Sequence, residues 1–198
     1  MQRPNPFKVV REFEEAVAEY TGAPYAVAVD SCTNALFLAC KYLKVEEVTI
    51  PAKTYISVPN SIVHAGGKVN FRDYKWAGSY QLEPYPIWDC AKRFTSGMYR
   101  PGAIQCVSFQ TRKILSIGKG GMLLTDSLDA VKWLKSARFN GRSEVPLEED
   151  TYDSFGWNMY MTPEQAARGL WNFYYLPDHN EDQPVEDFLD LRQVDLFK

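Results

Sequence analysis

The sequence predicts an α/β protein with a mainly parallel sheet flanked by helices. Short runs of β-branched and apolar residues alternate with helical segments of about ten residues, a pattern typical of crossover connections between parallel strands. Polar residues stand directly after several of these runs, where sheets of this class bind their ligands. The 198 residues, of which 45% are apolar, are enough to bury a core without disulfides or metals.

The first expected helix covers Phe7 to Tyr20, where apolar residues recur at helical spacing before Gly22, a common helix stop. Tyr25 to Val29 is a short β-rich run. The following elements expected in the N-terminal half are a helix from Thr33 to Leu43, a strand from Val48 to Ile50, a turn at Pro51 and a helix from Tyr55 to His64.

The central part of the chain predicts further strands at Lys68 to Phe71, Pro86 to Trp88, Gln105 to Phe109 and Met122 to Leu124. A helix is expected from Asp126 to Arg138, followed by a polar stretch. Thr162, Pro163 and Gln165 form a helix start signal, with an N-cap, a first-turn proline and a capping-box partner. We expect residues 1–176 to form one large domain and residues 177–198 a tail that packs on it or on a partner subunit.

Charge and composition exclude several classes of function. The 22 Lys and Arg residues against 25 Asp and Glu residues give a net charge of −3, so the basic footprint of a general nucleic-acid binder is absent. The N-terminal segment MQRPNPFKVV has no apolar core of a signal peptide, and no run reaches membrane-spanning length. The 4 cysteines form no CxxC pair, so we expect no metal and a cytoplasmic location.

The segment from Ser108 to Asp126, SFQTRKILSIGKGGMLLTD, is dense in residues that could carry chemistry. Lys113 follows a strand end, where desolvation can favour the neutral amine that attacks a carbonyl carbon. The glycines from Gly118 to Gly121 allow a close backbone approach or a sharp turn. On this segment alone, a hairpin with basic surface residues is the commoner interpretation.

Three other segments each contain residues that allow a functional and a structural role. Asp89, after an apolar strand, could pair with a buried cation or could cap a helix. Ser31 and Thr33 could open an anion-binding helix or act only as caps. Tyr55 could present its ring for stacking or could belong to the core.

Taken in order, these features resemble the DegT-like nucleotide-sugar aminotransferases, which use pyridoxal 5′-phosphate (PLP) and have fold type I. The similarity extends from about Phe13 to Leu170. It is carried by the segments FEEAVAEYTGAPYAVAVDSCTNAL, VTIPAKTYISVPNSIVHAGGKVNFRD, IWDCA, SFQTRKILSIGKGGMLLTD and GWNMYMTPEQAARG. The resemblance implies that residues 1–176 form the PLP-binding large domain of that fold.

The resemblance also implies a role for each candidate residue. Lys113 would bond the cofactor and then act as a general base, and Asp89 would pair with the pyridine nitrogen. Tyr55 would stack on the ring. Asn158 matches a segment that reaches the neighbouring subunit's cofactor, which implies a homodimer. The phosphate would be held by a group of small residues, Ser31, Cys32, Thr33 and Ser108.

Several positions depart from the family pattern. Lys92 stands where Gln or His is usual, Lys119 where an acid is usual, Cys32 where glycine is common and Tyr160 where arginine is frequent. Three lysines would then surround one anionic cofactor. Their like charges would either lower the pKa of a lysine, which favours its attack on a carbonyl, or bind the phosphates of the substrate. The family also continues into a smaller C-terminal domain, so the resemblance implies a shortened form without it.

The implied activity is transfer of an amino group from an amino acid, expected to be glutamate, to a keto group of a nucleotide-linked sugar, for example in polysaccharide biosynthesis. An alternative is a catalytically reduced protein that keeps the fold and the cofactor but serves as a binding or regulatory partner. A third is a cofactor-free interaction module. Lys113 argues against the dehydratases of the family, in which histidine takes its place.

Overall fold

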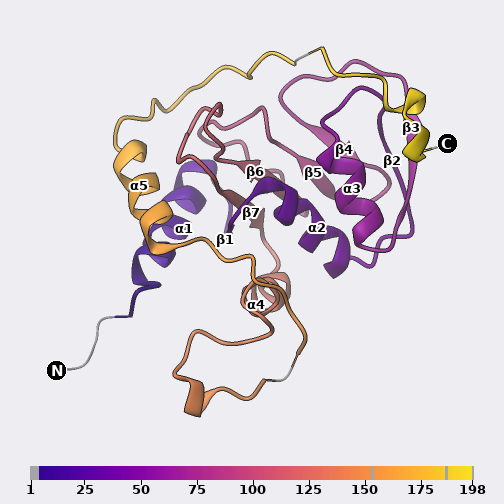
Figure 1. The fold of residues 1–198 in the computed structure, drawn as a ribbon. Coiled ribbons are helices and arrows are strands. Elements are labelled where there is room, and N and C mark those ends of the chain that lie inside the picture. Colours follow the sequence, from indigo (N-terminus) through magenta and orange to yellow (C-terminus); the bar gives the residue numbers. More distant parts are fainter. Residues whose placement is uncertain (1–4, 153, 186, 198) are drawn as a thin grey trace.

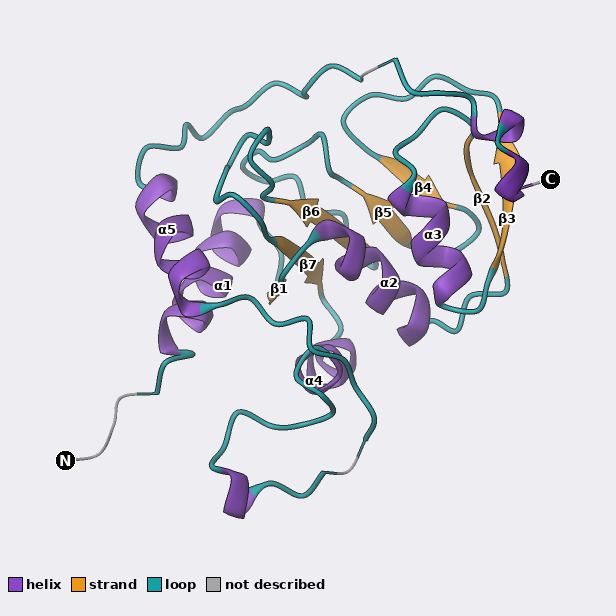
Figure 2. Cartoon of the chain, viewed as in Figure 1, coloured by secondary structure: helices purple, strands orange, loops and turns teal. Residues whose placement is uncertain are grey.

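The computed structural model describes residues 5–152, 154–185 and 187–197. Its strands form a five-stranded sheet in the order β1-β7-β6-β5-β4 and a two-stranded sheet of β2 and β3 (Figures 1 and 2). The strands are β1 (Tyr25–Val29), β2 (Glu47–Pro51), β3 (Lys68–Arg72), β4 (Tyr80–Leu82), β5 (Ile87–Asp89), β6 (Ile104–Ser108) and β7 (Gly121–Thr125).

The strand directions make the sheet mixed in detail. β5 and β6 are parallel, while β7 runs antiparallel to both β6 and β1, so β1, β5 and β6 share one direction. β4 is antiparallel to β5, and β2 is parallel to β3. An isolated antiparallel bridge between Thr49 and Glu83 connects the two sheets. The expected α/β fold is therefore confirmed, but the larger sheet is mixed rather than mainly parallel, because β4 and β7 run opposite to β1, β5 and β6.

Helices cover both faces of the larger sheet. They are α1 (Lys8–Thr21), α2 (Cys32–Tyr42), α3 (Ser57–His64), α4 (Leu128–Ala137) and α5 (Pro163–Phe173), with short 3-10 helices η1 (Leu147–Glu149), η2 (Leu191–Gln193) and η3 (Asp195–Phe197). One core contains Val27 and Leu123 together with α2, α3 and α4. The other contains Ala28 and Met122 together with α1 and α5. Alternate residues of β1 and β7 thus face opposite cores, as strand geometry requires.

The helix boundaries follow the local chemistry of the sequence. α1 ends at Gly22, whose φ of +75° is the left-handed conformation that glycine adopts without strain. α5 begins with the expected capping box of Thr162 and Gln165, with Pro163 in the first turn. β4 was not predicted, because three residues are too few to produce a recognisable alternation. Within the described residues no helix is both long and apolar enough to cross a membrane.

A buried ionic cluster joins α1, β1 and α4. The Arg138 side chain, 1% exposed, donates to the Glu14 carboxylate and to the carbonyl oxygen of Ala28. Its second nitrogen donates to Glu144 at 3.0 Å, and the Lys135 ammonium lies 3.1 Å from Glu14. The Ala28 amide donates to Glu14 at 2.8 Å. Every charged group in the cluster has a partner, which is the condition for burying charge without a large penalty.

We predict that Arg138→Met destabilises the protein by about 3–5 kcal/mol, because it leaves a buried carboxylate with reduced compensation. Urea denaturation measures the loss. Lys132→Met on the same helix is the control, since that side chain is 70% exposed, and its midpoint should stay nearly unchanged. A loss for Arg138→Met below about 1 kcal/mol, the size of an exposed ion pair, would contradict the structural role given to the cluster.

Candidate active site

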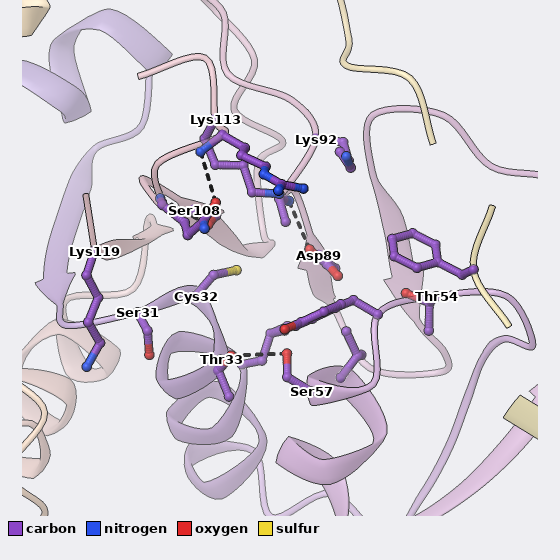
Figure 3. Close-up of a pocket in the computed structure, with 18 of the residues that line it drawn as sticks. Ser31, Cys32, Thr33, Thr54, Ser57, Asp89, Lys92, Ser108, Lys113 and Lys119 are labelled. Atoms are coloured by element: carbon purple, nitrogen blue, oxygen red, sulfur yellow. Dashed lines mark hydrogen bonds between the residues drawn. The ribbon is translucent and has the colours of Figure 1, made fainter. Parts of the chain in front are cut away.

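A cavity of about 470 Å³ lies at the ends of the central strands (Figure 3). Asp89 ends β5, Ser108 ends β6, and Ser31 follows β1. Because these three strands share one direction, their carboxyl ends meet at the same edge of the sheet. The cavity is lined by all but one of the residues to which the resemblance assigns a role, namely Ser31, Cys32, Thr33, Tyr55, Asp89, Ser108 and Lys113; the exception is Asn158.

Asp89 is the buried acid of the cavity. Its side chain accepts hydrogen bonds from the Ala91 amide and the Tyr80 hydroxyl, both at 2.9 Å. Burial raises its pKa, and these bonds together with the charge of Lys113 oppose that rise. No helix begins directly after Asp89, because the next element of the chain is β6, so the role of Asp89 is not that of an N-cap.

Tyr80 was missed by the sequence analysis because it lies on the unpredicted strand β4. Its hydroxyl shares a 2.6 Å hydrogen bond with the Thr54 hydroxyl in addition to its bond to Asp89. Burial, and next the negative charge of Asp89, raise the Tyr80 pKa well above its ordinary value. The phenol therefore stays protonated and holds the Asp89 carboxylate in place. The only sequence signal was a tyrosine before an apolar residue at i+2, which is too common to identify it.

Lys113 lies on the loop between β6 and β7. The two strands are antiparallel, so the loop is a hairpin connection, in agreement with the structural interpretation of this segment. Its lysine nevertheless lines the cavity. The Thr111 amide donates to the Gly118 carbonyl at 3.1 Å, and the Lys113 amide donates to the Gln110 carbonyl at 2.9 Å. Leu115 is buried below. The loop is thus folded onto the core, and it holds Lys113 near enough to Asp89 to influence its pKa.

The start of α2 forms the opposite side of the cavity (Figure 3). Ser31 caps the helix by accepting from the Asn34 amide, and Thr33 donates to the Ser57 hydroxyl at 3.0 Å. A Cβ on Gly121 would lie 2.4 Å from the Ser31 carbonyl carbon, so only glycine lets β7 approach this turn. A helix N-terminus surrounded by hydroxyls favours an anion.

Cys32 also lies at this turn but is chemically quiet. It is almost fully buried, and its thiol contacts the carbonyl oxygen of Cys106 at 3.6 Å. Burial raises its pKa well above the usual range, so the group stays a neutral thiol.

The positions that depart from the family pattern separate into two groups. Lys92 and Lys119 line the cavity, and the Lys119 ammonium lies 3.2 Å from the Asp30 carboxylate. Asn158 does not line it; its backbone pairs with Phe139 in an isolated bridge. Tyr160 packs edge-on against the Phe7 and Phe139 rings, at centroid distances of 5.6 and 5.3 Å.

The groups that line the cavity fit PLP, a flat phosphorylated pyridine. The cavity offers an acid for the ring nitrogen, an aromatic face at Tyr55, hydroxyls and a helix N-terminus for the phosphate, and an amine at Lys113. Its volume is within the usual range for small-molecule sites, roughly 300–1,000 Å³. Among the described residues, no three His, Cys, Asp or Glu side chains are grouped so that they could hold a metal ion.

Comparison with known proteins identifies the family. The sequence model of the DegT/DnrJ/EryC1/StrS aminotransferase family matches residues 5–100 and 87–184. The chain therefore belongs to this family of sugar aminotransferases, which are PLP-dependent enzymes.

Curated relatives of the chain are consistent with this family. UDP-4-amino-4,6-dideoxy-N-acetyl-beta-L-altrosamine transaminase of Campylobacter jejuni serotype O:23/36 is 41% identical over 90% of this chain and 60% of its own length. The GDP-perosamine synthase of Caulobacter vibrioides is 25% identical over 87% of this chain and 58% of its own length. The spore coat polysaccharide biosynthesis protein SpsC of Bacillus subtilis is 26% identical over 85% and 57%. The chain thus spans a little under two thirds of the curated relatives it matches.

Solved structures share the fold. AtS13 from Actinomadura melliaura superposes with a TM-score of 0.76, at 22% identity, over 88% of this chain and 61% of that one. The sugar aminotransferase CalS13 from Micromonospora echinospora gives a TM-score of 0.74 at 19% identity, over 85% and 61%. These similarities confirm the expected fold class.

The raised pKa of Asp89 predicts a pH-dependent effect of Asp89→Asn on the cofactor-free protein. A carboxyl group whose pKa is raised on folding contributes stability at acidic pH, and that contribution is lost as the pH rises through the folded-state pKa. Since asparagine does not ionise, the variant should be more stable than wild type at pH 7 and equal to it near pH 4. Thermal melts across this range measure the difference. A constant difference, or one that grows toward acidic pH, would contradict the pKa direction.

Proposed function

We propose that this protein is a PLP-dependent aminotransferase that transfers an amino group to a keto group of a nucleotide-linked sugar. The observation that carries the proposal is that Lys113 and Asp89 line one cavity, with the start of α2 on its opposite side. Bound PLP supplies an electron sink that makes the bonds at an amine-bearing carbon easier to break. The remaining chemistry falls to the side chains of the chain itself.

Lys113 is the proposed attachment residue and proton carrier. Backbone hydrogen bonds fix the loop that carries it, so the point from which the side chain extends is set before any ligand arrives. Asp89 holds a negative charge against the pyridine nitrogen, and the Tyr80 hydroxyl orients the carboxylate for that task. The burial of Asp89 strengthens such a charge pair, because little water screens it.

The start of α2 is the proposed phosphate site. Backbone amides and hydroxyls for the phosphate come from four lining residues, Ser31, Cys32, Thr33 and Ser108. We propose Tyr55 as the stacking residue, since its ring lines the cavity and is 59% exposed. A partly exposed ring beside a cavity is available to a ligand, unlike one packed in the core.

The names of the relatives support nucleotide sugars as substrates, since they include a UDP-sugar transaminase and a GDP-perosamine synthase. Glutamate is the proposed amino donor. We also propose a cytoplasmic homodimer, in which Asn158 of one subunit reaches the cofactor of the other. The location of Asn158 outside the lining of its own cavity is consistent with that role.

Lys113→Ala should abolish the visible absorbance that the protein gains with PLP, because the attaching amine is lost. Lys119→Ala is the matched control, as it removes an amine that also lines the cavity, and it should keep the absorbance. Spectral titration with PLP measures both. An unchanged band in Lys113→Ala together with its loss in Lys119→Ala would transfer the attachment role to Lys119.

Glutamate separates an aminotransferase from a protein that has kept only the cofactor. In the PLP-loaded protein, excess glutamate should bleach the visible band as the amino group moves to the cofactor. An added keto acid should restore it. A band that glutamate leaves untouched would favour the catalytically reduced alternative.

The proposed dimer can be tested by sedimentation velocity. The mass of one chain is 22.7 kDa. At micromolar concentrations of the PLP-loaded protein we expect a species of twice that mass. A single species of monomer mass would remove the proposed role of Asn158.

A further inference from the structure

The chain after α5 lines the cavity with a residue that lies beyond the family match. The family model ends its match at residue 184, yet Phe188 is a lining residue. Figure 1 shows this tail passing from the end of α5 across the molecule to the β2–β3 sheet, where the C-terminus lies. We define the tail as residues 178–185 and 187–197.

Two anchor points hold the tail on either side of Phe188. On the N-terminal side, Asp182 forms a two-bond ion pair with Arg93, at 2.6 and 2.8 Å. On the C-terminal side, the Leu191 amide donates to the Ala52 carbonyl at 2.9 Å, and the Leu191 side chain is buried. Phe188 is therefore held in place by contacts on both sides of it.

Gln183 connects the tail to two cationic residues of the cavity. Its backbone amide donates to the Lys92 carbonyl, and its side-chain amide donates to the Arg112 carbonyl, both at 2.8 Å. The side chains of Lys92 and Arg112 line the cavity. The tail thus fixes the backbone from which these two positive charges extend.

Three aromatic side chains from separate segments line the cavity. Phe188 and Tyr55 lie 6.3 Å apart between ring centroids, and Trp76 is the third lining aromatic. The Trp76 indole donates to the Lys53 carbonyl at 3.0 Å, so its ring is oriented. Rings presented in this way offer stacking faces to a flat aromatic group.

Positive side chains outnumber acidic ones in the lining of the cavity. The described lining residues include four cations, Lys92, Arg112, Lys113 and Lys119, and one acid, Asp89, and Lys119 is paired with the Asp30 carboxylate. The α2 N-terminus and its hydroxyls already suit one phosphate. Cations beside aromatic faces match a nucleoside diphosphate, which carries a base and two phosphates.

We propose that Phe188 is a substrate-binding residue whose ring stacks on the base of a nucleoside diphosphate, while Lys92 and Arg112 bind its phosphates. This inference rests on the proposed function, because it assigns the nucleotide portion of the sugar substrate to one side of the same cavity. It makes the tail a part of the site that binds the nucleotide.

Calorimetry with UDP, GDP and inorganic pyrophosphate tests the assignment on the PLP-treated full chain. Phe188→Ala should weaken UDP or GDP binding by about 5- to 100-fold, as expected for a lost stacking ring. Pyrophosphate has no base, so its affinity should not change. Phe188→Trp should keep nucleotide affinity. Leu189→Ala is the control, since Leu189 is 62% exposed and does not line the cavity.

The outcomes separate this inference from the proposed function. Unchanged UDP and GDP binding in Phe188→Ala, or an equal loss for nucleotide and pyrophosphate, would overturn the role of the ring. Equal effects of Phe188→Ala and Leu189→Ala would do the same. PLP uptake is read separately by absorbance: a wild-type protein that binds UDP through Phe188 but takes up no PLP would refute the proposed function and leave the nucleotide site standing.

Discussion

The shared direction of β1, β5 and β6 is the constraint on which the cavity depends. These strands place the start of α2, Asp89 and Ser108 at one edge of the sheet, although they are separated by up to 77 positions in the chain. β7 runs the other way, and this reversal makes the loop carrying Lys113 a short hairpin return to the same edge. Reversing or shifting any of these strands would separate the acid from the amine.

Two buried carboxylates illustrate different uses of burial. Glu14 is paired with Arg138 and Lys135, so its charge is compensated and it connects elements of the fold. Asp89 is held by a tyrosine hydroxyl and a backbone amide, and its pKa is raised by desolvation. A desolvated carboxylate is stabilised by a cationic ligand group held directly against it, which is what a protonated pyridine nitrogen offers. The desolvation of Asp89 is therefore only partly compensated at the cavity, whereas the charge of Glu14 in α1 is paired.

Much of the fold was predictable because its signals are local. Gly22, the Thr162 capping box and the apolar run of β1 each depend on nearby residues. The position of Lys113 in the cavity came instead from the resemblance, since its segment alone also reads as a plain hairpin. Tyr80 and Phe188 could not be found this way: one lies on a three-residue strand and the other on a tail that contacts the cavity only through long-range anchors.

The central claim is that one particular lysine attaches the cofactor, and reductive labelling tests it most directly. The PLP-treated protein is reduced with borohydride, digested and mapped by mass spectrometry. The account predicts a single stoichiometric label on the peptide that contains Lys113. A label on Lys92 or Lys119, or one scattered over surface lysines, would contradict it.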